Sequence, residues 1–310
     1  MEELENLRKK VRNGYLIGMI FIAISLICIT IFFIFYNLIL EYFHIYFIVC
    51  MTDLVIGISL VSNLLSKRKK EYKKVYKRLF VRKALKNVFT DLKYQPSKGI
   101  PYTIINNLDM VDMGNQYKSE DYISAKYKGI NFEQADVYIE NITEIRDNNG
   151  NKNTKYKTLF NGRWMIFDFN KGFFEDIQII QKGFNNSKRK KSYSKKHDKF
   201  KKVFMESQSF NRKFHIYAKD EHNALNIITP KLIEKIEQIS NNIKGKKIIG
   251  FIDGRMHIGI NNYKDSFEPR NVFFRIDVDK EERKVAKDIE MITQLVDIMY
   301  LDNIGLIKDK

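Results

Sequence analysis

The amino-acid sequence predicts an α+β fold: an N-terminal two-helix transmembrane hairpin, a basic juxtamembrane helix, and a cytosolic domain with a mainly antiparallel sheet and two or more packed helices. Three observations support this prediction. Two long apolar runs lie near the N-terminus, and basic residues cluster on their outer sides. Further along, apolar residues no longer recur every three or four positions but alternate with polar ones.

The first apolar run, Gly14–Leu40, contains no charged residue, and its 27 positions exceed the roughly 20 that a helix needs to cross the hydrocarbon core. The second run, Tyr42–Leu65, follows almost directly and contains one acid, Asp53. We therefore expect two transmembrane spans, at about residues 14–37 and 43–65.

Basic residues flank this hairpin, residues 14–66, on both outer sides. Four lie in the N-terminal tail of residues 1–13 and six lie within residues 67–74, whereas the connector around Glu41 has none. The positive-inside rule then predicts a multi-pass plasma-membrane protein with both termini in the cytoplasm. A cleaved signal peptide is a poor alternative, because the first run is too long and a second run follows it.

The formal net charge of +17 is concentrated in two segments. Residues 67–98 carry a net charge of +11 and residues 182–202 carry +9, so the rest of the chain is nearly neutral. Both cysteines, Cys28 and Cys50, lie inside the apolar runs, which excludes a disulfide framework and a thiolate metal site.

Anionic phospholipid headgroups are the partners that these basic segments indicate, at about 1 kcal/mol per Lys or Arg close to the surface. Nucleic acid is disfavoured, because the nearby aromatic residues do not recur at a spacing that suits base stacking. For the first segment, the alternative is that the charges only set the membrane topology and form a solvated helix face. For the second segment, the alternative is a solvated insertion. The candidate lipid-contacting residues are Lys67, Arg68, Lys69, Lys70, Lys73, Lys74, Lys188, Arg189, Lys190 and Lys191.

Residues 67–98 are predicted to form the basic juxtamembrane helix, over Lys67–Leu92, and a linker that includes Pro96. The cytosolic α+β domain then covers residues 99–310. Short turn-forming sequences separate its predicted strands, which favours antiparallel neighbours. These strands are Tyr102–Ile105, Tyr122–Tyr127, Phe132–Ile145, Tyr156–Phe169, Phe173–Gln181 and Lys202–Ala218.

Four further features complete the predicted domain. The polar, basic stretch of residues 185–199 predicts a disordered loop. Thr229 and Pro230 predict the start of a helix, with a capping hydroxyl and a proline at the first helical position. The Asp-Gly pair at residues 253–254 predicts a hairpin with a type I′ turn. A one-sided apolar stripe predicts a last helix over about residues 279–300.

Asp53 is a candidate intramembrane polar residue, because an acid near the middle of a span costs about 2.5–3.5 kcal/mol on insertion scales. Ser25 and Thr30 lie at a similar depth in an antiparallel hairpin, so a hydrogen bond to a hydroxyl, or protonation of the acid, would offset this cost. A tolerated residue that fixes helix pairing is the preferred interpretation. A proton or ion path, or an oligomer contact, is the alternative.

Catalytic and metal-binding motifs are weak in this sequence. The five histidines show no metal-ligand spacing, and no P-loop, nucleophile elbow or dinucleotide fingerprint is present, so no metal or cofactor is predicted. Nothing in the sequence argues positively for an enzyme. The competing hypothesis, a membrane-tethered enzyme, requires candidate acids and bases to converge in one cleft: His215, Asp220, His222, Asp253 and His257.

Several short strings in the C-terminal half resemble a bacterial membrane-anchored family known as domain-of-unknown-function family 3137. They are FNGRW at residues 160–164, SFNRKFHIYA at 209–218, Asp220 and Ala224, TP at 229–230, FIDG at 251–254 and FEP at 267–269. Leu225 and Asn226 depart from the expected pattern. The resemblance implies a cytosolic domain beneath a bacterial plasma membrane, and no activity or catalytic residues. The abundance of Lys, Ile and Asn also suits a bacterium with a low-GC genome.

The predicted function is therefore that of a bacterial integral membrane protein that presents a cytosolic α+β binding or scaffold domain at the inner leaflet. The partner is an unidentified membrane or cytosolic protein, and homo-oligomers are one outcome. Trp164, Phe210 and Tyr217 are candidates for a partner surface. The alternatives are the tethered enzyme and a small oligomeric transporter or channel component, the latter resting on Asp53 alone.

Overall fold

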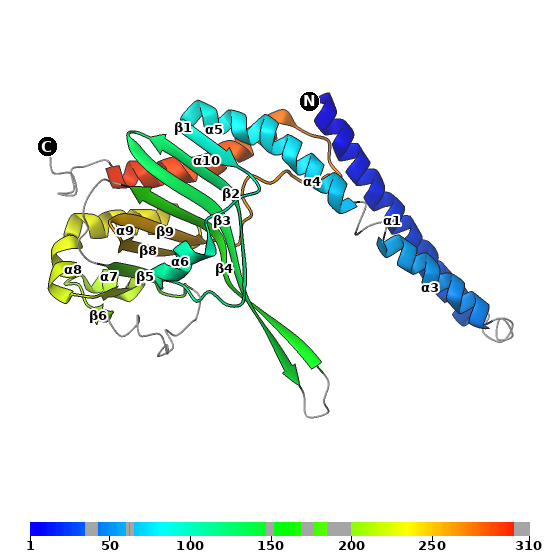
Figure 1. Ribbon diagram of the computed structural model, residues 1–310, viewed down its shortest axis with the longest axis horizontal. Helices are drawn as coiled ribbons and strands as arrows, with labels where there is room; N and C mark the ends of the chain where they lie inside the picture. Colours follow the sequence, from blue (N-terminus) through cyan, green and yellow to red (C-terminus); the bar gives the residue numbers. More distant parts are fainter. Residues whose placement is uncertain are drawn as a thin grey trace. The chain divides into compact units, whose positions relative to one another are not determined.

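The structure is a computed structural model of the 310-residue chain (Figure 1). It describes residues 1–34, 43–59, 62, 65–146, 152–168, 176–184 and 200–300. The chain divides into two compact units. Unit 1 consists of Met1–Lys83 and Glu268–Val285, and unit 2 consists of Ala84–Phe267 and Ala286–Lys310.

Unit 1 is built from helices. Helix α1 (Glu2–Ile34) packs antiparallel to α3 (Phe43–Ser59), and α4 (Leu65–Tyr76) then lies against the N-terminal half of α1. Gly57 allows the close approach of α3 to α1, since a Cβ on it would lie 2.8 Å from the Cβ of Phe21. Small residues serve the same purpose between transmembrane helices.

The predicted juxtamembrane helix is shorter than the sequence suggests. After α4 the chain forms a π-helical turn, η3 (Lys77–Val81), and then α5 (Arg82–Val88), but Thr90–Gln95 forms the edge strand β1. The prediction of helix up to Leu92 was wrong because β1 pairs with β2 and buries Tyr94. Tertiary pairing of this kind overrides a local helical pattern.

Unit 2 contains a nine-stranded sheet with the order β1-β2-β3-β4-β9-β8-β5-β7-β6. Every pair of neighbours is antiparallel, which confirms the predicted α+β class with a mainly antiparallel sheet. The remaining strands are β2 (Gln116–Tyr127), β3 (Ile130–Arg146), β4 (Lys152–Asp168), β5 (Ile177–Gln181), β6 (Lys201–Val203), β7 (Phe214–Ala218), β8 (Lys246–Ile252) and β9 (Arg255–Asn261).

Two predicted strands are wholly or partly helical. Tyr102–Ile105 belongs to helix α6 (Tyr102–Leu108), because Pro101 precedes a turn in which Ile105 and Leu108 are buried together at helical spacing. Four alternating residues are too few to separate a strand from a helix. The predicted strand Lys202–Ala218 is interrupted by α7 (Gln208–Lys213), whose N-cap Ser207 accepts from the Phe210 amide.

Helices lie on both faces of the sheet. Trp164 and Gly250 point to the face covered by α6 and the segment after it, because a Cβ on Gly250 would meet Met110 at 2.6 Å. Arg163 precedes Trp164 on β4 and points to the other face, because side chains alternate along a strand. Lys247 on β8 points to the same face as Arg163, since both residues pair with Ile260 of β9. There Arg163 donates to Asp288 O in α10 (Val278–Tyr300), and Lys247 donates to Ser240 O in α9 (Pro230–Asn242).

Three local predictions are confirmed by the structure. Helix α9 begins after Thr229, whose side chain accepts from the Leu232 amide at 3.2 Å. Asp253 and Gly254 both have positive φ, 51° and 72°, as a type I′ turn between β8 and β9 requires. The last helix, α10, buries the predicted apolar stripe. The predicted loop of residues 185–199 lies outside the described residues.

Glycine makes room at the centre of the sheet, at Gly162 and Gly259. A Cβ on Gly162 would lie 2.0 Å from Ile260 O, and one on Gly259 would lie 2.9 Å from the Trp164 ring. Trp164 therefore occupies space that a side chain on β9 would fill. This packing explains the glycine and the tryptophan of the FNGRW string.

We predict that Gly162→Ala destabilises the fold by about 1–3 kcal/mol, because the added methyl group meets the backbone of β9 and not a side chain that can move. Unfolding followed by the fluorescence of Trp164, the one tryptophan in the chain, measures this change. Asn153→Ala, at an exposed position of the same strand, is the control and should shift the unfolding free energy by less than about 0.5 kcal/mol. Equal midpoints for the two variants would contradict the packing argument.

Candidate functional site

Helix α1 is, among the described residues, the one helix long and apolar enough to span a membrane. Only 11% of its apolar window is buried, and many of its large apolar side chains are exposed, Leu26 at 59% and Phe33 at 73% among them. A core helix of a soluble protein would be mostly covered. This exposed apolar surface makes α1 a candidate membrane anchor.

The predicted second span is supported less clearly. Helix α3 is apolar but has 17 residues, near the lower limit of about 17–25 for a span. Residues 60, 61, 63 and 64 of the predicted span lie outside the described residues. The exposed large side chains of α3 are Ile45, Phe47, Ile48, Val49, Met51, Val55, Ile56 and Ile58.

Asp53 has the hydroxyl partner that its depth in the apolar pair requires. Ser25 Oγ donates to Asp53 Oδ2 at 2.8 Å, and Ser25 itself is 1% exposed. Thr30 does not share this contact, because its hydroxyl donates to Ile27 O within its own helix. The Asp53–Ser25 hydrogen bond thus joins α1 and α3 within one chain.

The predicted lipid-contacting residues have different environments. Lys67, Arg68, Lys69, Lys70 and Lys74 are exposed on α4. Lys73 instead forms an ion pair with Glu268. The candidates in the second segment, Lys188, Arg189, Lys190 and Lys191, lie outside the described residues.

Glu268 joins the C-terminal part of unit 1 to α4 and η3. Its carboxylate pairs with Lys73 and, at 2.8 Å, with Lys77, which is 4% exposed. Burial alone would raise the pKa of Glu268, but the two lysines outweigh burial and hold it below its ordinary value. Lys284 also donates to the Glu268 carbonyl. Nearby, the Tyr76 hydroxyl donates to Glu281 at 2.9 Å.

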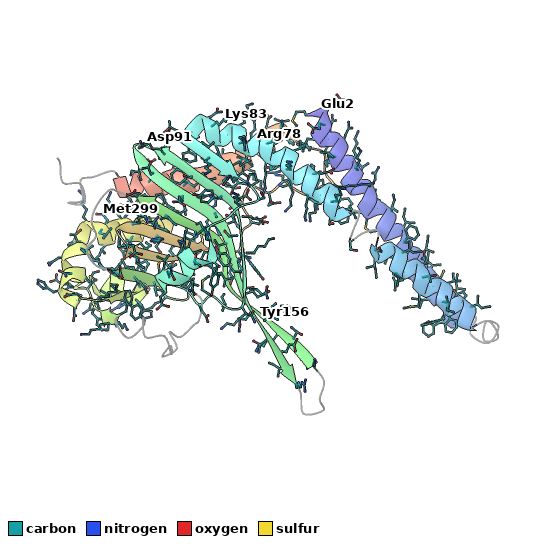
Figure 2. The ribbon with its side chains drawn as sticks, in the orientation of Figure 1. Glu2, Arg78, Lys83, Asp91, Tyr156 and Met299 are labelled. Carbon is teal, nitrogen blue, oxygen red and sulfur yellow. The ribbon has the colours of Figure 1, made fainter. Side chains whose placement is uncertain are left out.

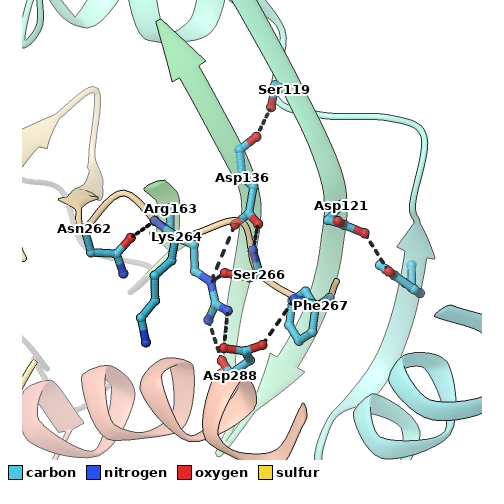
Figure 3. A network of polar contacts seen from close by, with 10 residues as sticks. Ser119, Asp121, Asp136, Arg163, Asn262, Lys264, Ser266, Phe267 and Asp288 are labelled. Atoms are coloured by element: carbon cyan, nitrogen blue, oxygen red, sulfur yellow. Dashed lines mark hydrogen bonds and ion pairs between the residues drawn. The ribbon is translucent and has the colours of Figure 1, made fainter. Parts of the chain in front are cut away.

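A second polar cluster lies inside unit 2, between the sheet and α10 (Figure 3). The Arg163 guanidinium is 1% exposed and lies between Asp136 and Asp288, at 3.6 Å from a carboxylate oxygen of each. Its Nε donates to Ser266 Oγ at 2.9 Å, and its Cζ lies 4.9 Å from the centre of the Phe267 ring. Sequence analysis did not single out this cluster. The sequence feature that could have indicated the cluster is Arg163, a charged residue within a largely apolar part of a predicted strand.

Asp136 is the unusual acid of this cluster. Burial raises its pKa to about 7, because Arg163, at 3.6 Å, is too distant for a direct hydrogen bond and only partly opposes the effect. The Ser266 amide donates to Asp136 Oδ2 at 2.6 Å and also favours the charged form. Nearby Asp121 and Asp265 act in the opposite direction.

Asp121, Asp136 and Asp265 form the one carboxylate group, among the described residues, that could meet a metal ion. Their ligand oxygens lie within 4.8 Å of one another, and oxygen ligands suit Mg²⁺ or Ca²⁺. However, Tyr94 donates to Asp121 Oδ1 at 2.6 Å, and Arg163 already places a positive charge beside Asp136. We therefore interpret this group as part of the buried charge network.

The histidines and acids of the tethered-enzyme hypothesis have separate roles. The Asp220 carboxylate accepts from the Asn223 amide at the start of α8 (Glu221–Ile227), where His222 lies, and Asp253 occupies the hairpin turn. His257 on β9 and His215 on β7 are separated by β8 and β5, about 14 Å at ordinary strand spacing. These two described histidines therefore do not meet in one cleft, as the hypothesis requires.

His257 is buried in the sheet, at 1% exposed, and neither ring nitrogen has a hydrogen-bond partner among the described residues. Burial, with a smaller effect from Arg255, lowers the pKa of His257 to about 3. The imidazole is therefore neutral at physiological pH. It has no proton-transfer partner among the described side chains.

Two of the three predicted partner-surface residues were wrong. Trp164 and Phe210 are each 0% exposed, because Trp164 packs on Gly259 and Phe210 packs against Phe214 with ring centres 4.7 Å apart. Their aromatic character serves the core. Tyr217, on β7, is partly exposed.

Comparison with known proteins gives a family without an assigned activity. Residues 158–301 match DUF3137, a protein family of unknown function. This match confirms the predicted resemblance over the C-terminal half, from the FNGRW string through α10. It does not extend to the N-terminal helices.

Two other comparisons add little about function. No curated protein sequence matches the chain. The crystal structure of the mycobacterial trehalose monomycolate transport factor A, TtfA, is similar with a TM-score of 0.34 and 6% sequence identity, over 73% of this chain and 93% of that chain. A likeness of this extent does not transfer an activity.

We predict that Asp136→Asn gains stability relative to the natural protein as the pH rises from about 4 to about 7. Since the pKa of Asp136 is raised from 3.8 to about 7, its folded-state proton stabilises the protein at low pH, and that contribution is lost as the pH rises. The difference in unfolding free energy should change by about 1.4 kcal/mol per pH unit in this window. Denaturant titrations at several pH values, with Asp253→Asn at the exposed β8–β9 turn as the control, measure it. A difference that does not vary with pH would contradict this assignment.

His257→Gln should show the opposite dependence. The pKa of His257 is lowered from 6.5 to about 3, so the unfolded chain gains a proton that the folded chain lacks, and stability falls as the pH decreases through this window. Relative to the natural protein, the variant should gain about 1.4 kcal/mol per pH unit on acidification below 6.5. The same titrations measure it, with His222→Gln at an exposed position of α8 as the control, and equal slopes for the two variants would contradict this assignment.

Proposed function

We propose that this chain is a bacterial plasma-membrane protein. Its N-terminal helices form a two-span hairpin with both termini in the cytoplasm, and its α+β domain is a binding or scaffold module at the inner leaflet. The observation that carries this proposal is the unburied apolar surface of α1, joined to an exposed basic face on α4. A bilayer accommodates both features, because its core takes the apolar side chains and its anionic headgroups take the lysines.

The packing of α1 and α3 supports two spans over one. The helices run antiparallel, Gly57 permits their close contact, and Ser25 satisfies the acid of α3. A hydrogen bond across transmembrane helices contributes about 0.6–2 kcal/mol. Because Asp53 has a hydrogen-bond donor in its own chain, it needs no second copy to satisfy its carboxylate, and this weakens the channel alternative.

The basic face of α4 supports contact with anionic lipid. Leu65 packs on Gly14, near the start of the apolar run in α1, and the exposed cluster of residues 67–70 follows directly. These side chains therefore lie at the level where headgroups surround the hairpin. Four such charges contribute roughly 4 kcal/mol to membrane association at about 1 kcal/mol each.

A binding module is favoured over an enzyme by the roles of the polar residues that the structure describes. Asp220 caps a helix, Asp253 forms a turn, and Arg163 is enclosed by Asp136 and Asp288. These are positions that fix the fold. The matched family likewise carries no assigned activity.

Labelling of single cysteines with a membrane-impermeant maleimide tests the topology. In spheroplasts that express the full chain without Cys28 and Cys50, we expect Glu41→Cys to react from outside. Glu3→Cys and Lys70→Cys should react only after permeabilisation. Opposite sidedness of residues 3 and 70 would contradict the hairpin, and extraction of the chain by alkaline carbonate would contradict membrane anchoring altogether.

A further inference from the structure

A segment of unit 1 that is distant in sequence lies against the start of α1. Arg8 Nη1 donates to Val272 O at 2.5 Å, while its Nε and Nη2 donate to Glu5 at 2.9 and 2.6 Å. Arg8 is 3% exposed, so this contact is enclosed. The rings of Tyr15 and Phe273 also meet, with centroids 6.0 Å apart.

These contacts place the segment at the end of the apolar surface of α1. Tyr15 is the second residue of the apolar run that begins at Gly14. Gly14 faces Leu65, which lies two residues before the exposed cluster of residues 67–70. Phe273 is therefore at the level where apolar side chains give way to basic ones, which is the level of a membrane–water interface.

Two adjacent aromatic rings of this segment are exposed. Phe274 is 72% exposed and Phe273 is 42% exposed, and Val278 nearby is 40% exposed. Arg270 and Arg275 are exposed on either side of them, and Arg270 also forms an ion pair with Glu281 at 3.7 Å. This combination of apolar rings flanked by cations is typical of segments that lie in the headgroup region of anionic membranes.

The segment is held at both ends, so its rings keep their position. At its start, Glu268 pairs with Lys73 and Lys77. At its end, Asp277 Oδ1 accepts from the Lys280 amide at 3.1 Å and the Asp277 carbonyl accepts from the Glu281 amide at 3.0 Å, which caps the start of α10. Attachment of this kind lets a short loop present side chains without a further cost in conformational entropy.

We propose that Phe273 and Phe274 insert into the cytoplasmic leaflet beside α1, with Arg270 and Arg275 on anionic headgroups. Residues 270–278 then attach the C-terminal half of the chain to the membrane, in addition to the hairpin and the basic face of α4. The proposal rests on the membrane anchoring of α1. Lipid is the occupant, because the exposed rings continue the apolar surface of α1 and lie between two arginines, whereas the acid of the segment, Asp277, pairs with Lys280.

The test uses the full chain in liposomes that contain anionic lipid, with a tryptophan as a depth probe. Phe274→Trp is compared with Leu26→Trp, at a 59% exposed position within the apolar run, and with Lys83→Trp. Lys83 is exposed and lies 18 residues after Leu65, about 27 Å along the helical path (Figure 2). Trp164 is buried in the core and gives a constant background.

Lipids brominated near the headgroup or near the chain terminus quench probes at those depths. We expect the Phe274→Trp emission to lose more intensity with the shallow label than with the deep one, the Leu26→Trp emission to show the reverse order, and Lys83→Trp to lose none. Quenching of Leu26→Trp but not of Phe274→Trp would overturn this inference and leave the anchor intact. Absence of quenching for Leu26→Trp as well would overturn the proposed function.

Discussion

The ion pairs of Glu268 with Lys73 and Lys77 are the constraint on which the arrangement of unit 1 depends. They tie a residue near the C-terminal helix to the helices that follow the apolar pair, nearly 200 positions earlier in the sequence. A buried acid is retained only when its charge is compensated, and two lysines compensate this one. The hydrogen bonds of Tyr76 with Glu281 and of Arg8 with Val272 add to them in holding residues 268–285 beside α4 and α1.

The FEP string, residues 267–269, crosses the boundary between the two units in the sequence. Phe267 ends the first part of unit 2 and has a φ of 57°. Its ring packs on Arg163, and its amide donates to Asp288 Oδ2 at 3.2 Å. Glu268, the next residue, begins the second part of unit 1. Phe267 therefore packs within unit 2 on a buried arginine (Figure 3), and Glu268 pairs within unit 1 with two lysines, so each residue of the string has a structural role.

Much of the fold could be predicted from local sequence. The alternation of β3 and β4, the Thr-Pro start of α9 and the Asp-Gly turn are each fixed by residues close to one another in the chain. The errors at Thr90–Gln95 and Tyr102–Ile105 arose where pairing or burial by distant residues decided the conformation. The candidate site was harder to predict from the sequence. Charge alone indicated the lysines of α4, but the pairing of Glu268 and the contact of Phe273 with Tyr15 join residues over 190 positions apart.

The central claim is that residues 268–285 lie against the start of α1, and a disulfide cross-link tests it most directly. In a chain without Cys28 and Cys50, Tyr15→Cys and Phe273→Cys replace two rings whose centroids are 6.0 Å apart. Oxidation in native membranes should link the peptides of residues 15 and 273 after proteolysis, whereas Ile20→Cys, exposed further along α1, should give no link to residue 273. Equal yields from both pairs, or no link from either, would contradict the account.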